Sequence, residues 1–399
     1  MIYLGSPELC LQRVTNRIIH LTGTNGKGSS CYMLGASFHD SGHCVGVFTS
    51  PHVRHPTDCI AIAEPSCMGY RNMSIKKFNA LRAALCRRSR FSVFMTEFEV
   101  LTCIAVVFFS FAKPKFIIVE VGMGGRLDAT NVWSCAKDCV LTNISLEHTE
   151  FLGNTPPEIC CHKVGILTAC SRLFVSTNLP AGCAHVIRSE SSWRLSSWIY
   201  WVDVFVSRSS NTFPSGIDDL PVSIAAKGCH QLSNAKLVVS ICRKQWEYIP
   251  FGGATWALPG RLQQVPFLDK SLILDGAHNA SGMRALFNYV NAAITGPVLW
   301  ILAFSGNKAN VLDNLPFSSA DVICFTEFQP VASMPWVKVA PRSILKSRLG
   351  QRCPGSYICD SESLHQALLL ASSIRGELTI VITGSLYLVS EFFFMTDSK

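Results

Sequence analysis

One glycine-rich stretch constrains the fold of this chain more than any other, the segment Leu-Thr-Gly-Thr-Asn-Gly-Lys-Gly-Ser-Ser at residues 21–30. It follows a branched apolar run at 18–21 that is typical of a buried parallel strand. It precedes a predicted helix from Ser29 or Ser30 to about Ser41. A strand, a glycine-rich loop and a helix in this order predict an α/β sheet with an anion site, because the loop N–H groups and the helix N-terminus attract phosphate.

The side chains of this loop suit a bound nucleotide. Lys27 is placed to reach the outer phosphates, and the Ser29 hydroxyl is placed to face a magnesium ion. The spacing is tighter than in the general G-x-x-x-x-G-K-[ST] loop, because Gly28 separates Lys27 from Ser29. The alternative is a plain glycine turn, which would not require a strand, a loop, a lysine and a helix in this order.

Length and composition predict two packed domains. The chain has 399 residues, of which 48% are hydrophobic and only 16% charged, so disorder is excluded and two cores can form. The formal charge is +8, from 35 basic and 27 acidic residues. No long basic run or aromatic–basic interleaving concentrates this charge, so we expect phosphate- and carboxylate-bearing small molecules as partners and no nucleic acid.

Cysteine spacing and hydropathy predict a cytoplasmic protein. The 18 cysteines include no C-x-x-C pair, which favours reduced thiols over metal knuckles or disulfides. The longest apolar stretch, 100–112, has 13 residues and is too short to cross a bilayer. The first residues lack the charged and apolar regions of a signal peptide. We expect no membrane contact, and without a clear transit peptide a mitochondrial pool stays open.

Three candidate metal ligands follow predicted strands. Ser50, Glu120 and His148 each stand near the carboxyl end of a strand, where an open α/β sheet binds its ligands. Glu120 is the strongest candidate, because a carboxylate at the end of an apolar strand is costly to bury unless it is paired or holds a cation. Each has an alternative role: an N-cap for Ser50, an ion pair with Arg126 for Glu120, and a structural contact for His148.

The apolar helix at 100–112 has a local start signal. Thr96 as N-cap and Glu99 three residues later form a capping box. This role alone would explain both residues, so a role in substrate binding needs other support.

The domain boundary is predicted at a proline–glycine cluster. Residues 1–247 form the first domain, 248–254 the linker and 255–399 a second domain in which strands and helices again alternate. Between 168 and 226 the pattern weakens, and no element is assigned there. In the second domain, strands are expected at 271–274, 298–303, 322–325 and 379–383, and helices at 282–293, 342–349 and 361–373.

Taken together, a series of segments resembles the folylpolyglutamate synthase and dihydrofolate synthase family, within the Mur-type ATP-dependent amide ligases. The segments follow the family order and are 22–30, 49–52, 96–99, 120–131, 148–155, 163–166, 230–235, 259–262, 275–279 and 384–388. Segments 51–58, 97–102 and 334–337 look most similar to fungal dihydrofolate synthases. The resemblance implies a Mur-ligase-like α/β fold: a P-loop ATP-binding domain with a central, mostly parallel sheet, and a smaller C-terminal α/β domain.

The resemblance also implies a reaction. The γ-phosphoryl group of ATP passes to a pterin-linked carboxylate, and the amine of L-glutamate attacks the resulting acyl phosphate to form an amide. The substrates would be ATP, L-glutamate and dihydropteroate or a folate, and the protein is expected to be a monomer. Magnesium at two sites and potassium are the implied cations.

Residue roles are carried over by position. ATP contacts match Thr24, Asn25, Gly26, Lys27, Gly28, Ser29, Asn234, Arg261 and Asp275, the last two in the second domain, so the site would complete when the domains close. Ser50 and Glu120 match the first magnesium site, and His148 the second. Lys163 matches a lysine carried as a carbamate, and with Lys27 and His278 it makes up the catalytic set. Substrate contacts match Thr96, Glu97, Phe98, Glu99, Leu127, Asp128, Ala129 and Ser385.

The chain departs from the family in three places. His162 stands where a glutamate usually precedes the carbamylated lysine, and segments 63–73 and 168–226 hardly resemble the family. Dihydrofolate synthase is the leading hypothesis, and a folylpolyglutamate synthase that extends reduced folates is the nearest alternative. A catalytically eroded nucleotide-binding paralogue is a further alternative. A P-loop kinase or GTPase would leave residues 275–279 unexplained.

Overall fold

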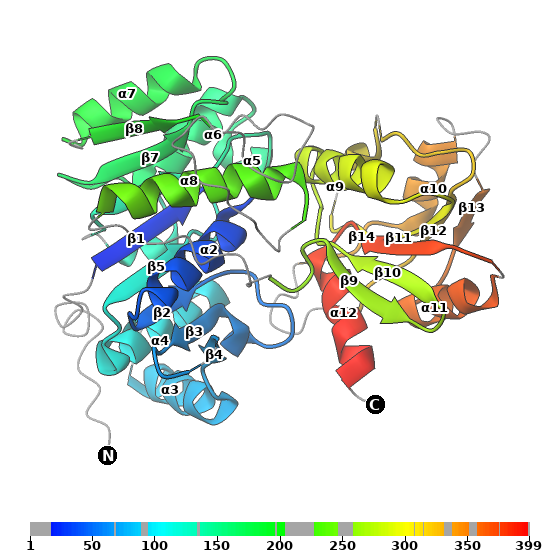
Figure 1. Cartoon of the computed structure of the whole chain (residues 1–399), viewed down its shortest axis with the longest axis horizontal. Coiled ribbons are helices and arrows are strands. Elements are labelled where there is room, and N and C mark those ends of the chain that lie inside the picture. The colour runs from blue at the N-terminus through cyan, green and yellow to red at the C-terminus, as the bar shows by residue number, and fades with distance from the viewer. Residues whose placement is uncertain are drawn as a thin grey trace. The chain divides into compact units, whose positions relative to one another are not determined.

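The computed structural model divides the chain into two compact units (Figure 1). One comprises Met1–Ala225 and His230–Trp256, the other Ala226–Cys229 and Ala257–Lys399. The structure describes residues 17–67, 69–88, 95–133, 136–195, 198–203, 227–245, 258–306, 308–313, 315–330, 337–350, 357–374 and 376–397. The predicted linker at 248–254 and the segment 334–336 lie outside these residues.

A largely parallel sheet forms the centre of the first unit. Its strands are β1 (Arg17–Thr22), β2 (Val45–Phe48), β3 (Ile60–Ala63), β4 (Arg71–Asn72), β5 (Phe116–Glu120), β6 (Asp138–Leu141), β7 (Arg172–Ser176) and β8 (Trp198–Val202). Their order is β4-β3-β2-β5-β1-β6-β7-β8. The pairs β2–β3 and β3–β4 are antiparallel, and the other pairs are parallel. The predicted fold class, a central and mostly parallel sheet, is confirmed.

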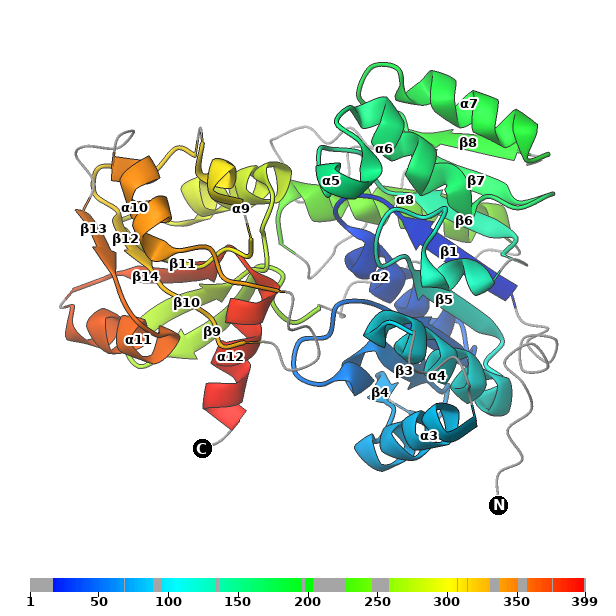
Figure 2. The ribbon, with the colours of Figure 1, turned by 180° about the vertical axis from the view of Figure 1, so that it is seen from behind.

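Helices cover both faces of this sheet. They are α2 (Lys27–Asp40), α3 (Ile75–Arg88), α4 (Glu97–Ala112), α5 (Thr149–Leu152), α6 (Pro156–Lys163), α7 (Cys183–Trp193) and α8 (Cys229–Gln245), with short 3-10 turns η1 (Pro56–Cys59), η2 (Ala129–Val132) and η3 (Val164–Ile166). Helices α2 and α8 lie on one face, and α4, α6 and α7 on the other (Figures 1 and 2). Helix α2 begins two residues earlier than predicted, because Gly26 takes a left-handed conformation at its N-cap.

The central position of β1 places the glycine-rich loop. Leu21 pairs with Glu120 of β5 on one side, and Thr22 pairs with Leu141 of β6 on the other. The chain leaves β1 through α2 toward β2, beyond β5, whereas β6 lies on the opposite side. Such a switch point opens a crevice at the carboxyl ends of the strands, so the loop, Glu120 and the residues after β6 come together at one edge.

The stretch in which no element was predicted contains regular structure. Strand β7, helix α7 and strand β8 occupy Arg172–Val202 and extend the sheet by two parallel strands. These strands have five residues each, too few to establish a period in a sequence. Residues 204–226 lie outside the described part of the chain.

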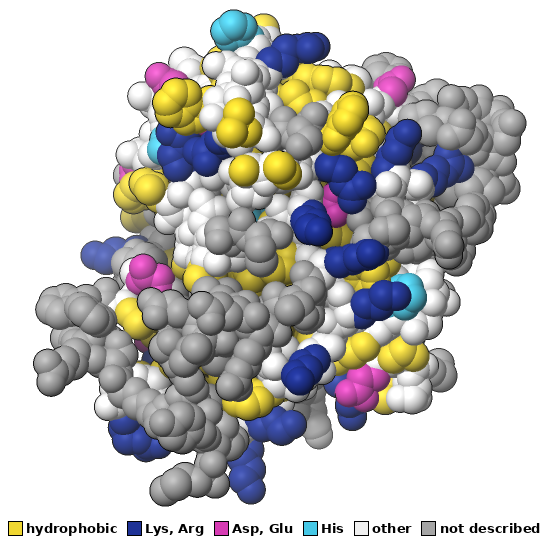
Figure 3. All heavy atoms as spheres, turned by 90° about the vertical axis from the view of Figure 1, so that its left-hand side faces the viewer, with side chains coloured by type: hydrophobic (Ala, Val, Ile, Leu, Met, Phe, Trp, Pro, Cys, Tyr) yellow, Lys and Arg dark blue, Asp and Glu magenta, His cyan; other side chains and the backbone are white. Residues whose placement is uncertain are grey.

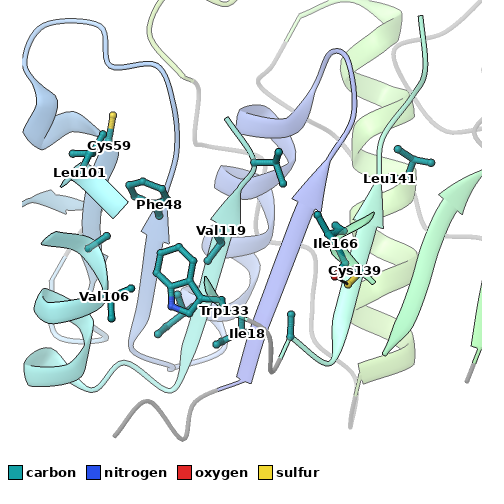
Figure 4. Packing of buried hydrophobic residues seen from close by; sticks show 14 of the residues in the cluster. Ile18, Phe48, Cys59, Leu101, Val106, Val119, Trp133, Cys139, Leu141 and Ile166 are labelled. Carbon is teal, nitrogen blue, oxygen red and sulfur yellow. Dashed lines mark hydrogen bonds between the residues drawn. The ribbon is translucent and has the colours of Figure 1, made fainter. Parts of the chain in front are cut away.

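The core of the first unit packs behind β1, β2, β5 and β6. Ile18, Phe48 and Val119 contribute from the strands, and Trp133 lies among them with 1% of its surface exposed (Figure 4). The rings of Phe48 and Trp133 are 5.7 Å apart, centroid to centroid. Truncating such a side chain costs roughly 3–5 kcal/mol, so this cluster anchors the sheet whose edge carries the loop.

The second unit has its own sheet and core. Its strands are β9 (Gln263–Phe267), β10 (Lys270–Leu274), β11 (Val298–Leu302), β12 (Val322–Phe325), β13 (Tyr357–Asp360) and β14 (Thr379–Thr383), in the order β13-β12-β11-β14-β10-β9. Its helices are α9 (Ala280–Ala293), α10 (Arg342–Gly350), α11 (Leu364–Ser373) and α12 (Leu386–Asp397), with a 3-10 turn η4 (Lys308–Leu312). The predicted strands and helices are present. The antiparallel β9, the edge strand β13 and helix α12 were not predicted.

Surface and cysteine chemistry are unremarkable in the part that the structure describes. On the face in Figure 3, Lys and Arg side chains are spread among apolar and uncharged ones. All the described cysteines are free thiols; burial of the thiols was predicted from the sequence as well, but Cys86, Cys170 and Cys229 are exposed. Among the described helices, none is both long and apolar enough to cross a membrane.

Candidate active site

The glycine-rich loop is held in shape by the residues that follow β6. Asn143 forms a reciprocal pair with Asn25: the Asn25 N–H donates to Asn143 Oδ1 over 2.9 Å, and Asn143 Nδ2 donates to the Asn25 carbonyl over 3.1 Å. Thr142 Oγ1 donates to the same carbonyl over 2.7 Å. Strand β6 ends at Leu141, and beyond it the Thr142 N–H still donates to the Thr22 carbonyl and the Thr24 N–H to the Asn143 carbonyl, each over 3.0 Å.

Lys27 begins helix α2 and lies back over its own loop. Its Nζ donates to the carbonyls of Gly23 and Thr24 over 3.0 and 3.3 Å. These contacts place the ammonium group at the mouth of the loop, where a phosphate bound by the N–H groups would meet it.

Lys163 points at the same loop from the end of α6. Its Nζ donates to the Gly23 carbonyl over 2.8 Å, so Lys27 and Lys163 share one acceptor. Burial, followed by the positive charge of Lys27, lowers the pKa of Lys163 to about 7, while the negative charge of Glu147 opposes the shift. A buried amine that is half neutral near pH 7 can act as a nucleophile.

Ser50 and Glu120 meet at the ends of β2 and β5. The Ser50 N–H donates to Glu120 Oε2 over 3.0 Å, and the Glu120 side chain is buried. Arg126 pairs with Glu190 of α7 instead, at 2.9 Å, so the alternative of an ion pair between Glu120 and Arg126 is wrong. A carboxylate and a hydroxyl beside a phosphate loop fit Mg²⁺, which prefers a few hard oxygen ligands and completes its shell with water and phosphate.

His148 is placed by a different set of contacts. It stands at the N-cap of α5 with φ 50°, and its Nε2 lies 2.9 Å from Glu147 Oε1. Within the described residues, no three His, Cys, Asp or Glu side chains cluster closely enough to hold a metal ion.

Thr96 and Glu99 form the predicted capping box at the start of α4. The Glu99 N–H donates to Thr96 Oγ1 over 3.2 Å, and the Thr96 N–H donates to Glu99 Oε2 over 2.6 Å. Glu97 pairs with Arg82 of α3 at 2.7 Å. Phe98 packs on Phe48 with ring centroids 5.9 Å apart. All four residues predicted here for the substrate therefore have structural contacts already.

The loop after β5 carries the strongly exposed Leu127 and a chain of hydrogen bonds that leads to a buried histidine. Leu127 is 87% exposed, and Ala129 opens η2. Asp128 accepts from Thr130 Oγ1 over 2.5 Å, so the Thr130 oxygen accepts from Nε2 of the buried His20, 2.8 Å away. Burial lowers the pKa of His20 to about 3, which keeps the imidazole neutral. This chain, which the sequence did not reveal, fixes the loop on β1.

In the second unit, β10 and β14 bring the predicted residues together. Asp275 follows β10, and its carboxylate accepts from the N–H groups of Leu262 and Ala277, each over 2.8 Å. Arg261 lies over Gly276, since a Cβ there would stand 2.7 Å from Arg261 Nη1.

His278 follows β10 and Ser385 follows β14, two strands that pair in the sheet of the second unit. His278 Nδ1 donates to the Gly276 carbonyl over 2.8 Å. Ser385 is buried and accepts from the Tyr387 N–H over 3.2 Å. Gly384 before it has φ 96°, and a Cβ there would stand 2.5 Å from the Ala303 carbonyl oxygen, so only glycine fits.

Helix α8 contacts the phosphate loop directly. Asn234, predicted as an ATP contact, lies against Gly26, where a Cβ would overlap its side-chain amide. Gln231 donates through Nε2 to Ser29 Oγ over 3.1 Å. Gln231 lies within the family-like segment 230–235, but no role was predicted for it. The pairing of Gln231 and Asn234 three residues apart on one helix was the available signal.

The fold and the loop define a class: a phosphate-loop α/β protein with a central parallel sheet and a second α/β unit. Residues 261–395 match the family model described as "Dihydrofolate synthetase, C-terminal domain". Over 415 residues the chain is 29% identical to the dihydrofolate synthetase of Saccharomyces cerevisiae, covering 98% of this chain and 94% of that protein.

Two solved structures are similar throughout. E. coli FolC in complex with DHPP and ADP matches this chain with a TM-score of 0.80 and 25% sequence identity. The match covers 98% of this chain and 92% of the FolC chain. The bifunctional folylpolyglutamate synthase/dihydrofolate synthase of Yersinia pestis, complexed with AMPPNP and Mn ion, has the same TM-score and identity, with coverages of 99% and 94%. Over nearly its whole length the chain is similar to proteins of the folylpolyglutamate synthase and dihydrofolate synthase family, whose C-terminal domain model matches its second unit. It is a ligase that forms C–N bonds.

Proposed function

We propose that this protein is a dihydrofolate synthase that joins L-glutamate to dihydropteroate at the expense of ATP. One observation carries the proposal: the phosphate loop with Lys27, the pair Ser50–Glu120 and the buried Lys163 meet at one edge of one sheet. A cation-rich anion site beside a hard oxygen pair is suited to phosphoryl transfer, in which catalysis is mainly positioning and neutralisation of charge. The similarity to the yeast dihydrofolate synthetase over 98% of the chain supports this choice of acceptor.

The loop residues divide the work in the first step. The N–H groups of residues 24–29 hold the phosphates, and Lys27 turns from its loop carbonyls to the transferring group. The carboxylate of the pteroate attacks the γ-phosphorus, ADP leaves, and an acyl phosphate forms. Ser50 and Glu120 would hold a magnesium ion, which would supply charge neutralisation for the phosphoryl transfer. Leu127, exposed on the loop after β5, offers an apolar contact to the pterin side of the substrate.

The second unit supplies the amine half of the reaction. His278 and Ser385 contact glutamate, whose amine attacks the acyl carbonyl and releases phosphate. Arg261 and Asp275 contribute to ATP binding. The first unit is thus the ATP-binding domain and the second the glutamate-ligase domain.

Further features of the site belong to the same proposal. Lys163 would react with carbon dioxide to form a carbamate and release a proton, and the new carboxylate and His148 would hold a second magnesium ion. Potassium is a further cation of the site. The enzyme acts as a monomer in the cytosol.

A second candidate function is folylpolyglutamate synthesis. The Yersinia pestis protein, similar over 99% of this chain, carries both activities in its name. The chemistry is the same, and only the distance between the acceptor carboxylate and the pterin differs.

Phosphate release by the purified protein with ATP, magnesium and glutamate tests the proposal. Dihydropteroate and tetrahydrofolate are offered separately as acceptors. The variant Lys27→Ala is the control for contaminating activity. We expect it to release at least 100-fold less phosphate, roughly what a lost transition-state contact costs. Release with dihydropteroate supports the proposal, and release with tetrahydrofolate alone moves the protein to the polyglutamate branch. ATP binding without release with either acceptor would favour the eroded paralogue. Wild-type rates in Lys27→Ala would refute the role of the loop.

A further inference from the structure

One buried amide ties helix α8 to the phosphate loop. Gln231 uses both ends of its side chain: Nε2 donates to Ser29 Oγ over 3.1 Å, and Oε1 accepts from Asn234 Nδ2 over 3.0 Å. Gln231 is 3% exposed and Asn234 6% exposed. Ser29 precedes Gln231 by 202 residues in the chain, so this bridge exists only in the folded unit.

The bridge leaves the Ser29 hydroxyl equipped for a metal. A hydroxyl oxygen has two lone pairs and one proton. The Gln231 amide occupies one lone pair, so the second lone pair remains for a cation and the proton for a phosphate oxygen. The amide also restricts rotation about the Ser29 side chain, which would otherwise sample several rotamers on the first turn of α2.

The same amide sets the orientation of Asn234. Because Asn234 Nδ2 donates to Gln231, Asn234 Oδ1 is turned away from Gln231. The side chain packs on Gly26, where a Cβ would stand 2.8 Å from Nδ2. Two residues that face a nucleotide in the proposed site, Ser29 and Asn234, are therefore aimed by one glutamine.

We propose that Gln231 is a positioning residue that fixes the Ser29 hydroxyl and Asn234 for a magnesium–nucleoside triphosphate complex. The inference rests on the proposed function for the identity of the ligand. Gln231 itself touches neither the reacting atoms nor the metal. It reduces the number of arrangements that the loop must give up when the nucleotide binds.

Nucleotide binding by the full chain tests this inference without reference to ligase activity. Binding of ADP with magnesium is titrated calorimetrically for the wild type, Gln231→Met and Gln231→Glu, with Gln366→Met, an exposed glutamine of α11, as the matched control. We expect Gln231→Met to weaken binding roughly tenfold, and Gln366→Met to leave it unchanged. The Michaelis constants for the pterin acceptor and glutamate should stay within about twofold.

Gln231→Glu separates the two ends of the amide. The carboxylate still accepts from Asn234 but no longer donates to Ser29, so the concentration of magnesium needed for half-maximal binding should rise more than in the control. If Gln231→Met weakened the apparent affinities for ATP, acceptor and glutamate equally, Gln231 would be a merely structural residue and the inference would be overturned. Unchanged binding in Gln231→Met would do the same.

A double-mutant cycle keeps the inference testable if Gln231→Met does not fold. In the Ser29→Ala background, Gln231→Glu should cost little beyond Ser29→Ala alone, because both changes break one contact. If the losses in binding free energy of the two single variants added up fully in the double variant, the inferred coupling between Gln231 and Ser29 would be refuted. If the wild type binds ADP with magnesium but releases no phosphate with any acceptor, the proposed function fails while the role of Gln231 is still decided by binding.

Discussion

Replacing Lys163 by methionine should stabilise the protein while it abolishes turnover. Its pKa of about 7, against an ordinary 10.5, means that the folded state disfavours the charged amine. The unfolded chain binds the proton more tightly, so between pH 7 and 10.5 unfolding takes up a proton and stability rises with pH. Below pH 7 the amine of Lys163 is charged in both the folded and the unfolded protein. The folded protein then carries the full cost of burying the charged amine, on the order of 5 kcal/mol.

The pH dependence gives a sharper magnitude than the penalty itself. Between pH 6 and pH 8 the folded amine passes from almost fully charged to about nine-tenths neutral, while the unfolded amine stays charged. The linkage relation gives a gain of about 1.4 kcal/mol over this interval in the wild type and none from this group in Lys163→Met. For a unit of this size, that corresponds to about 3–5 °C in melting temperature.

The assay is thermal unfolding of both proteins at pH 6 and pH 8 in decarbonated buffer, so that the amine stays unmodified. Contributions from all other groups cancel in the difference between wild type and variant. Lys76→Met, at an exposed position of α3, serves as the control and should follow the wild type. Parallel pH dependence in the wild type and Lys163→Met would refute the reasoning, since it would mean that Lys163 is not desolvated beside Lys27.

Two further predictions concern the loop and its strand. Gly26→Ala should weaken ATP binding at least tenfold, because φ is 84° and the new Cβ would overlap Asn234. The control is Gly42→Ala, where φ is 79° but the space around the new Cβ is open, and this variant should bind ATP normally. Equal ATP affinity in the two variants would contradict this prediction. His20 has its pKa lowered to about 3, so its neutral form contributes stability that is lost as pH falls below 6.5, by about 1.4 kcal/mol per pH unit. His20→Gln should remove this acid sensitivity in urea unfolding from pH 7 to 5, and an unchanged slope would count against a buried neutral imidazole.

Much of the fold could be predicted, because strong local signals agreed with it. The branched run before the loop, the capping box at Thr96 and the alternation of strands and helices after residue 270 all appear as expected. Among the elements missed, β7, β8 and β13 are short strands that pair with strands distant in the chain, and β9 is a short strand in a hairpin with β10. Five residues or fewer cannot show a period, so nothing local identified them.

The sequence by itself determined part of the chemistry of the site: a glycine loop with Lys27 and a carboxylate at the end of β5, whereas Lys163 was assigned only through the family resemblance. These signals are local, because a backbone conformation or the cost of burying a charge acts on each residue in place. Only the tertiary structure decided which groups meet. It placed Lys27 and Lys163 on one carbonyl, turned Arg126 to Glu190, and brought Gln231 to Ser29 across 202 residues. Such contacts depend on the order of strands in the sheet and on helix packing, which no local pattern encodes.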